Sequence, residues 1–247
     1  MILHKLILRF LKYKDDMGFY HIQAEDTVRW LDKAGVRLGR GATTLDLGCG
    51  HGMIGGILMG RGCRVTFADE NNWLLDEYRG ADFRVFDIER DDLAKLGRFD
   101  LVICSNVLEH ISRPERFLKS VDCLLEPGGK LYLSWTNWLS PWGGHEYSPF
   151  HYLGPRRGHL VFDRVVKRPR KHTPYENLFP TGIGSTLRMV RDNRNLAVRE
   201  IAPRYYPELA FIMRLPVLRE FLTWNCVLLL ERVDRRGSWA HSLRNSL

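Results

Sequence analysis

The chain has 247 residues, of which 45% are hydrophobic, and its formal net charge is +8. This length suits one α/β domain with an insertion, and no stretch approaches the roughly 20 apolar residues of a membrane span. The five cysteines are scattered and form no Cys-x-x-Cys pair. We therefore expect a cytoplasmic protein with free thiols, held together by neither disulfides nor structural zinc.

The first forty residues predict two helices. Positions 2, 3, 6, 7, 10 and 11 are apolar and are separated by basic residues, which is an amphipathic pattern. The plainer interpretation is a helix that packs on the domain. The alternative is a helix that lies on an anionic membrane surface. A second helix is expected over residues 18–34, with Gly35 as its end.

A glycine-rich turn follows the first predicted strand, residues 44–47. The run Asp46-Leu47-Gly48-Cys49-Gly50 continues to a third glycine at position 52. Three missing side chains let the backbone turn sharply and let a ligand approach closely. The next helix begins here, and its free N–H groups can receive a carboxylate or phosphate. By itself the pattern is moderate evidence, because glycines with this spacing also occur in dinucleotide-binding folds and in simple turns.

Further strands follow at regular intervals, and polar residues come where they end. Strands are expected over 64–68, 83–86, 98–104 and 130–135, with a helix over about 114–125. This alternation predicts a doubly wound α/β sheet of parallel strands with helices on both faces. Ligands of such sheets lie at the carboxyl ends of the strands, where Asp69, Asp87 and Asn106 fall. Asp69 comes 23 residues after Asp46, which suits a carboxylate that binds ribose hydroxyls.

A long connection, from Thr136 to Asn195, then leaves the ligand edge of the sheet. Such connections are usually functional, and this one is expected to cover the site as a lid. Its His145, Glu146 and His151 lack the spacing of a helical zinc site, so no metal is predicted. His145 or His151 is a candidate general base, with Glu146 next in line. The plainer interpretation is that the histidines only hold the loop.

The remaining residues complete one domain. We expect a strand over 197–202, an apolar helix over 207–222 broken at Pro216, and a strand over 224–232. The predicted organisation is a helical segment at 1–40, a cofactor-binding core at 41–136, a lid at 137–195, the last strands and helix at 196–233, and a basic tail at 234–247.

Together these motifs resemble class I S-adenosylmethionine-dependent methyltransferases, in particular the bacterial subgroup that includes the ubiquinone- and menaquinone-biosynthesis enzymes. The matching sequences are Leu-Asp-Leu-Gly-Cys-Gly-His-Gly, Phe-Asp-Leu-Val-Ile-Cys-Ser-Asn-Val-Leu-Glu-His and Leu-Glu-Pro-Gly-Gly-Lys-Leu. The lid sequence Gly-Gly-His-Glu…His-Tyr-Leu-Gly is similar to that of a narrower bacterial group of poorly defined substrate. The resemblance implies a Rossmann-like sheet of seven strands, the seventh antiparallel, with S-adenosylmethionine as cofactor.

The resemblance also implies which residues bind the cofactor. In the family the glycine loop packs on the methionine part, the acid after the second strand holds the ribose, and the acid after the third strand meets the adenine amine. The residues expected at the cofactor are Tyr20, Asp46, Gly48, Cys49, Gly50, Asp69, Glu70, Asp87, Ile88 and Asn106.

The acceptor is less well defined by the sequence. Basic residues concentrate in 156–172 and 232–244, which implies an anionic partner. Because 164–172 contains no aromatic residue, we expect a small-molecule or lipid- or sugar-linked acceptor and no nucleic acid. Oxygen is the expected acceptor atom, with nitrogen and carbon left open by the sequence. Peripheral contact with the inner membrane surface fits this charge. The alternatives are an RNA methyltransferase and a non-catalytic regulator that binds S-adenosylmethionine; a dehydrogenase would need Gly-x-Gly-x-x-Gly.

Overall fold

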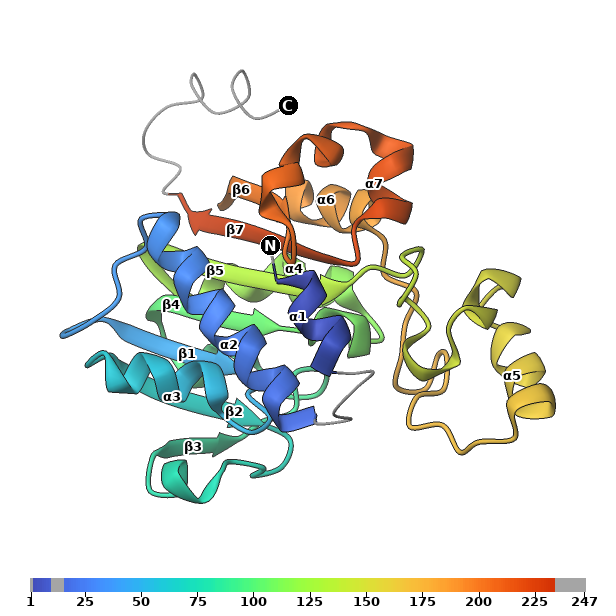
Figure 1. The fold of residues 1–247 in the computed structure, drawn as a ribbon. Helices are drawn as coiled ribbons and strands as arrows, with labels where there is room; N and C mark the ends of the chain where they lie inside the picture. Colours follow the sequence, from blue (N-terminus) through green and yellow to red (C-terminus); the bar gives the residue numbers. More distant parts are fainter. Residues whose placement is uncertain (1, 10–15, 234–247) are drawn as a thin grey trace.

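The computed structural model describes residues 2–9 and 16–233. Its centre is a seven-stranded sheet in the order β3-β2-β1-β4-β5-β7-β6 (Figure 1). The strands are β1 Thr43–Leu47, β2 Arg64–Asp69, β3 Asp82–Val85, β4 Phe99–Ser105, β5 Leu125–Thr136, β6 Leu196–Pro203 and β7 Asn225–Arg232. The first five pair in parallel, and β7 lies antiparallel between β5 and β6. The predicted fold class is confirmed.

Helices cover both faces of this sheet. The helices of the described chain are α1 Leu3–Leu8, α2 Asp16–Lys33, α3 Met53–Gly60, α4 Pro114–Ser120, α5 Gly158–Val166, α6 Ile183–Asp192 and α7 Pro216–Leu222, of which α5 lies apart from the sheet (Figure 1). Side chains alternate along each strand, so Leu131 and Leu133 of β5 enter the core beneath α4 and α6, while Tyr132 enters the core beneath α2 and α3. Apolar contact on both faces buries most residues of the central strands β1 and β4.

Two of the expected crossover helices are short. β2 and β3 are joined through the 3-10 helix η2 (Asp76–Tyr78), and β3 and β4 through η3 (Leu93–Leu96). Leu74 is the only fully buried apolar side chain between β2 and β3, which is too little to hold a longer helix on the sheet. The predicted helix after Pro114 also ends early, and the 3-10 helix η5 (Val121–Leu124) replaces its last turn. The break at Pro216 is confirmed, with the 3-10 helix η8 (Pro207–Arg214) before it.

The N-terminal helix packs on the domain. Ile2 and Leu6 are buried against Tyr205 and Tyr206, which supports the plainer interpretation for this side of α1. Its other side exposes apolar residues, including Leu8. Positions 10 and 11 of the predicted stripe and the basic tail 234–247 lie outside the described residues. Within the described ranges, the search for a helix with the length and hydropathy of a bilayer span finds no candidate.

Residues 137–182 of the predicted lid form a lobe beyond the carboxyl ends of β4 and β5 (Figure 1), whereas α6, which the prediction also assigned to the lid, packs on the sheet through Ile183 and Val190. The lobe contains α5 and two 3-10 helices, η6 (His145–Tyr147) and η7 (Phe150–Leu153). A small core of its own is made by Trp138, Tyr147, Phe162 and Leu178. The lobe therefore has a fixed internal structure, which can position side chains over the edge of the sheet.

Candidate active site

The turn after β1 is shaped by glycines in the left-handed region. Gly48, Gly50 and Gly52 have φ angles of 69°, 50° and 75°. A Cβ added to Gly48 would lie 2.4 Å from Val107 Cγ2, so packing forbids a side chain there. At Gly50, by contrast, an added Cβ would meet nothing within 4 Å. The turn is therefore packed against Val107 at Gly48 but has space around Gly50, where a ligand can approach the backbone.

Two carboxylates hold this turn and the start of α3 by accepting hydrogen bonds from the backbone. Asp46 Oδ2 accepts a hydrogen bond from Gly55 N (2.9 Å) in the first turn of α3, and Asp69 Oδ2 accepts one from Gly50 N (2.8 Å). Asp46 is 3% exposed. Burial raises the pKa of Asp46 to about 7; the Asp69 charge adds to this rise, and the hydrogen bond from Gly55 opposes it. Cys49 lies in the same turn with its thiol partly buried.

The acids after β2 and β3 are placed differently from one another. Glu70 is exposed, and its pKa is raised by partial burial and by the charges of Asp87 and Asp69. Asp87 closes its own turn: its Oδ1 accepts from Glu89 N (2.8 Å) and Arg90 N (3.2 Å). Its Oδ2 also lies 3.3 Å from Arg90 Nε. A contact between Asp87 and adenine stays a prediction. For it to form, the Asp87 carboxylate would have to give up one of its interactions within this turn.

Asn106 stands at the end of β4 in a left-handed conformation, with φ of 58°. Its Oδ1 accepts from Asn225 Nδ2 (2.8 Å) and Arg204 Nη1 (3.2 Å). Its Nδ2 donates to Gln23 Oε1 (3.2 Å) on α2. The side chain expected beneath the sulfonium is therefore fixed by three neighbours rather than free in a loop.

Arg204, just after β6, is the buried cation of this network, and its guanidinium is 2% exposed. It also donates to Thr27 Oγ1 (2.8 Å), Ser134 Oγ (3.2 Å) and the Gln23 carbonyl (3.3 Å). The rings of Tyr132 and Tyr205 flank it at about 6 Å. No spacing rule marks these residues in the sequence, since they come from α2, β5 and the segment after β6.

The network brings α2 over the glycine turn. The Tyr20 ring lies 6.1 Å from the His51 ring, measured between centroids. Tyr20 is 44% exposed, so its ring is available above the turn. This position agrees with a cofactor contact from α2, which stays a prediction.

The three lid residues singled out in the sequence do not form one cluster. His151 is buried inside the lid, where its Nε2 lies 3.0 Å from the Ser140 carbonyl oxygen, and burial lowers its pKa. His145 instead faces His172 and His110, with ring centroids 4.7 and 5.7 Å away. Burial, together with these two imidazoles, lowers the pKa of His145 to about 3. His145 is therefore neutral at pH 7 and has a free lone pair.

Glu146 links the η6 helix of the lid to the segment that contains Lys171 and His172. Its Oε1 accepts from the backbone N–H groups of Lys171 and His172, both at 2.6 Å, and its Oε2 lies 2.7 Å from His172 Nδ1. Burial alone would raise the pKa of Glu146, but these hydrogen bonds lower it to about 2. A carboxylate held in this way is a poor base, and its role is to position His172.

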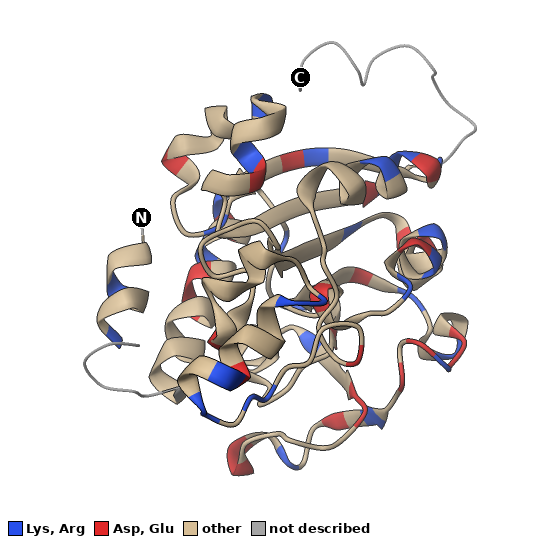
Figure 2. Cartoon of the chain, turned by 90° about the vertical axis from the view of Figure 1, so that its right-hand side faces the viewer, with Lys and Arg blue, Asp and Glu red and all other residues tan. Residues whose placement is uncertain are grey.

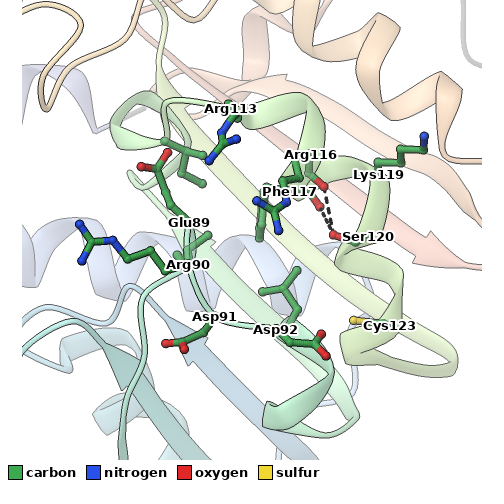
Figure 3. A pocket seen from close by; sticks show the side chains of 13 residues that line it. Glu89, Arg90, Asp91, Asp92, Arg113, Arg116, Phe117, Lys119, Ser120 and Cys123 are labelled. Atoms are coloured by element: carbon green, nitrogen blue, oxygen red, sulfur yellow. Dashed lines mark hydrogen bonds between the residues drawn. The ribbon is translucent and has the colours of Figure 1, made fainter.

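A separate surface cavity of about 540 Å³ lies between the segment 88–93 and α4 (Figure 3). Figure 3 shows Glu89 on one side of it and Arg113 and Arg116 on the other. Ile88 is the one predicted cofactor residue in its wall. The glycine turn, Asp69 and Asn106 do not line this cavity, so we do not assign the active site to it.

Comparison with known proteins decides the family. A model described as a methyltransferase domain matches residues 19–166, more than half of the chain. The chain belongs to the methyltransferase family. An uncharacterised methyltransferase of Mycobacteroides abscessus is 34% identical over 227 residues, which cover 86% of each chain. An uncharacterised methyltransferase of Mycobacterium tuberculosis is 38% identical over 132 residues, about half of each chain.

Solved structures show the same fold. An S-adenosylmethionine-dependent methyltransferase from Mesorhizobium loti matches with a TM-score of 0.56 and 21% identity, covering 81% of this chain and 95% of that one. Magnesium protoporphyrin IX methyltransferase from Synechocystis matches with a TM-score of 0.53 and 17% identity, covering 86% and 83%. The family match, together with the fold shared with these enzymes, makes S-adenosylmethionine the expected cofactor. The narrower ubiquinone-like subgroup stays a prediction.

The raised pKa of Asp46 predicts a pH-dependent stability that Asp46→Asn removes. Between the unfolded value of 3.8 and the folded value of about 7, the folded methyltransferase binds more protons than the unfolded chain. Its stability therefore falls as the pH rises through this window. In urea denaturation, we expect the wild type to lose about 1–3 kcal/mol relative to Asp46→Asn between pH 5 and pH 8. Identical pH profiles would show that the buried carboxyl stays ionised.

Proposed function

We propose that this methyltransferase moves the methyl group of S-adenosylmethionine to an oxygen of a small-molecule or lipid- or sugar-linked acceptor, bound beneath the lid. The observation that carries the proposal is the pairing of two imidazoles just beyond the end of β4, close in sequence to the asparagine expected beneath the sulfonium. His110 comes four residues after Asn106, and His145 of the lid faces it. A hydroxyl acceptor must lose its proton as the new C–O bond forms, and a neutral imidazole can take it.

The residues of the chain would act mainly by positioning. When bound, the cofactor supplies an electrophilic methyl group. The open backbone at Gly50 and the carboxylate of Asp69 fit its methionine and ribose parts. The Asn106 network holds the floor of the site in one geometry, and the aromatic lid excludes water. Fixing two reactants in a near-attack arrangement provides much of the rate in such transfers.

The carboxylate of Asp69 is expected to provide most of the ribose affinity. Asp69→Asn can still accept from Gly50 N–H but loses its charge, so S-adenosylhomocysteine should bind about 10–150-fold more weakly, or roughly 1.5–3 kcal/mol. Isothermal titration calorimetry measures this directly. Asp76→Asn is the matched control, because the Asp76 side chain is 87% exposed on η2. Failure of the folded wild type to bind S-adenosylhomocysteine would contradict the cofactor assignment.

Of the two lid histidines, we expect His145 to serve the acceptor proton because its ring faces His110 after β4, although its pKa of about 3 makes it a weak base. His145→Ala should leave cofactor affinity nearly unchanged and lower turnover by ~10²–10⁴-fold, and the loss should shrink as the pH rises. His151→Ala should act mainly on stability, because His151 is buried against Ser140 within the lid. Turnover is measured as the mass gain of a methylated product from a cell extract. Normal turnover in both variants would make the two histidines structural.

We also propose that the protein contacts an anionic membrane surface. On α1, Ile7 and Leu8 are exposed while Leu6 is buried. Helix α7 exposes four apolar side chains, those of Val217, Leu218, Phe221 and Leu222. The basic segment 164–172 is partly neutralised, because Arg170 pairs with Asp163 at 2.7 Å. Figure 2 shows basic and acidic residues interspersed on the lid side, which is unlike the continuous basic stripe that tracks a nucleic-acid backbone.

Vesicle binding tests this contact. The double substitution Ile7→Ser and Leu8→Ser should reduce co-sedimentation with anionic vesicles and leave the free energy of unfolding nearly unchanged, since both side chains are already exposed. Leu6→Ser is the control that should lower stability, because Leu6 is buried. Salt should weaken the binding. Equal recovery with neutral and anionic vesicles would leave α1 as a packed helix only.

A further inference from the structure

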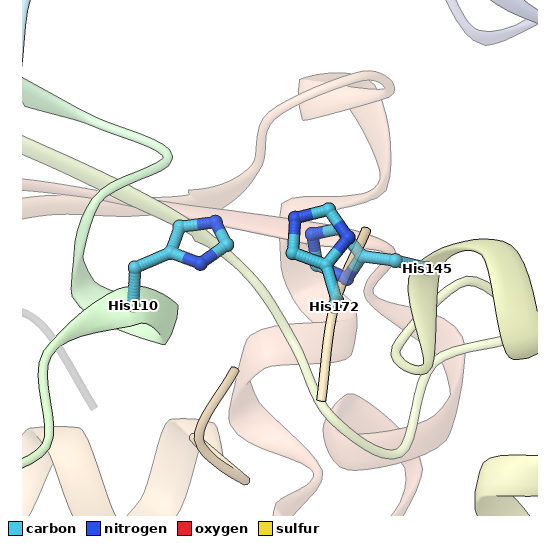
Figure 4. A group of neighbouring side chains, drawn as sticks. All are labelled: His110, His145 and His172. Atoms are coloured by element: carbon cyan, nitrogen blue, oxygen red, sulfur yellow. The ribbon is translucent and has the colours of Figure 1, made fainter. Parts of the chain in front are cut away.

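The structure assigns a metal site to three histidines that the sequence scatters over more than sixty residues: we propose that His110, His145 and His172 together bind one Zn²⁺ ion. One ring nitrogen of each lies within 4.8 Å of those of the other two. Figure 4 shows the three imidazoles facing one another from three separate segments. His110 belongs to the 3-10 helix η4 (Leu108–His110) after β4, whereas His145 and His172 belong to the lid.

The outer ring nitrogens have the partners that metal-binding histidines need. His110 Nδ1 lies 2.6 Å from the Asn177 carbonyl oxygen, and His172 Nδ1 lies 2.7 Å from Glu146 Oε2. Both acceptors favour a proton on Nδ1, which leaves the lone pair on Nε2 for a metal. Ligands of zinc are typically oriented in this way by a carboxylate or a backbone carbonyl.

The third imidazole carries an unsatisfied group. His145 Nδ1 is buried and has no hydrogen-bond partner among the described residues. A buried polar atom without a partner costs free energy, so such atoms in native proteins usually meet a ligand, an ion or an ordered water. Here the nearest groups are two further imidazoles, which offer lone pairs rather than a competing cation.

The donor set selects the metal. Three neutral nitrogens with a fourth position open are typical of catalytic zinc, whereas Mg²⁺ and Ca²⁺ prefer oxygen ligands. Tetrahedral Zn–N bonds of about 2.0–2.1 Å place the ligand nitrogens about 3.3 Å apart, so the lid would close by about 1–1.5 Å onto η4. The set differs from the one weighed in the sequence: His110 and His172 take the places of Glu146 and His151.

A bound ion would clamp the lid to the core. The η4 turn is already fixed, because the Glu109 carbonyl accepts from Phe179 N (2.7 Å) and Glu109 Oε1 accepts from Thr136 N (2.8 Å). The open fourth position would face an acceptor oxygen and lower its pKa, with His145 acting as a ligand instead of a base. Only this last role rests on the proposed transfer to oxygen; metal binding itself does not.

Titration with ZnCl₂ tests the site on the tag-free full chain after treatment with a chelator. We expect one Zn²⁺ per chain by calorimetry and by elemental mass spectrometry, and a tetrahedral absorption spectrum with Co²⁺. Glu146→Gln should weaken Zn²⁺ binding about 10–100-fold, and His110→Ala or His172→Ala by more than that. His159→Ala is the matched control, because His159 belongs to α5 of the same lid but lies outside the cluster.

Zn²⁺ should also slow amide exchange across residues 145–172 in the wild type, but not in His110→Ala. Should His172→Ala fail to fold, His172→Asn takes its place, since an amide can still hydrogen-bond Glu146. Binding that survives in both His110→Ala and the His172 variant, or that is equally weak in His159→Ala, would overturn the proposal. Affinity for S-adenosylhomocysteine, measured on the same samples, separates this result from failure of the methyltransferase assignment.

Discussion

The burial of the Arg204 guanidinium among the strand ends is the interaction on which the site depends. Removing a cation from water is costly unless nearly every donor finds an acceptor. Here the acceptors come from α2, from β5 and from Asn106 at the end of β4. Satisfying one charge therefore fixes the relative positions of three elements. Moving any of them would leave further buried donors without partners, in addition to Arg204 Nε, which has none among the described residues.

Helix α2 connects this network to the glycine turn. Gln23 and Thr27 of α2 hydrogen-bond to Asn106 and Arg204. Tyr20 of the same helix lies beside His51 in the turn after β1. The turn itself is held by Asp46 and Asp69, whose mutual repulsion adds to the raised pKa of Asp46. A cation bound nearby would relieve that repulsion. The acidic edge thus complements a sulfonium-bearing cofactor in charge as well as in shape.

The lid is a long irregular connection, but contacts within it hold its side chains in defined positions. Its small aromatic core gives it internal structure, and Glu146 ties its beginning to its end. The η4 turn then gives it a fixed point on the sheet, through Glu109 and His110. Because these contacts meet at the three imidazoles, the proposed function would couple the chemistry of the acceptor to the closure of the lid at one place. Any ligand of this cluster would report on both.

The sequence by itself determined the fold and predicted where the cofactor binds. Alternating apolar strands, the glycines after β1 and an acid after each of β2 and β3 are local signals, since each depends on residues close together in the chain. The tertiary structure alone decided the rest. Arg204 meets Asn106 and Thr27, and His110 meets His172, only because the crossovers bring distant segments to the same edge. Glu146 looked like a spare base in the sequence, but its hydrogen bonds make it a support for His172. Side-chain partners that are far apart in sequence leave no periodic signal, because their contact depends on the packing of whole elements rather than on local spacing.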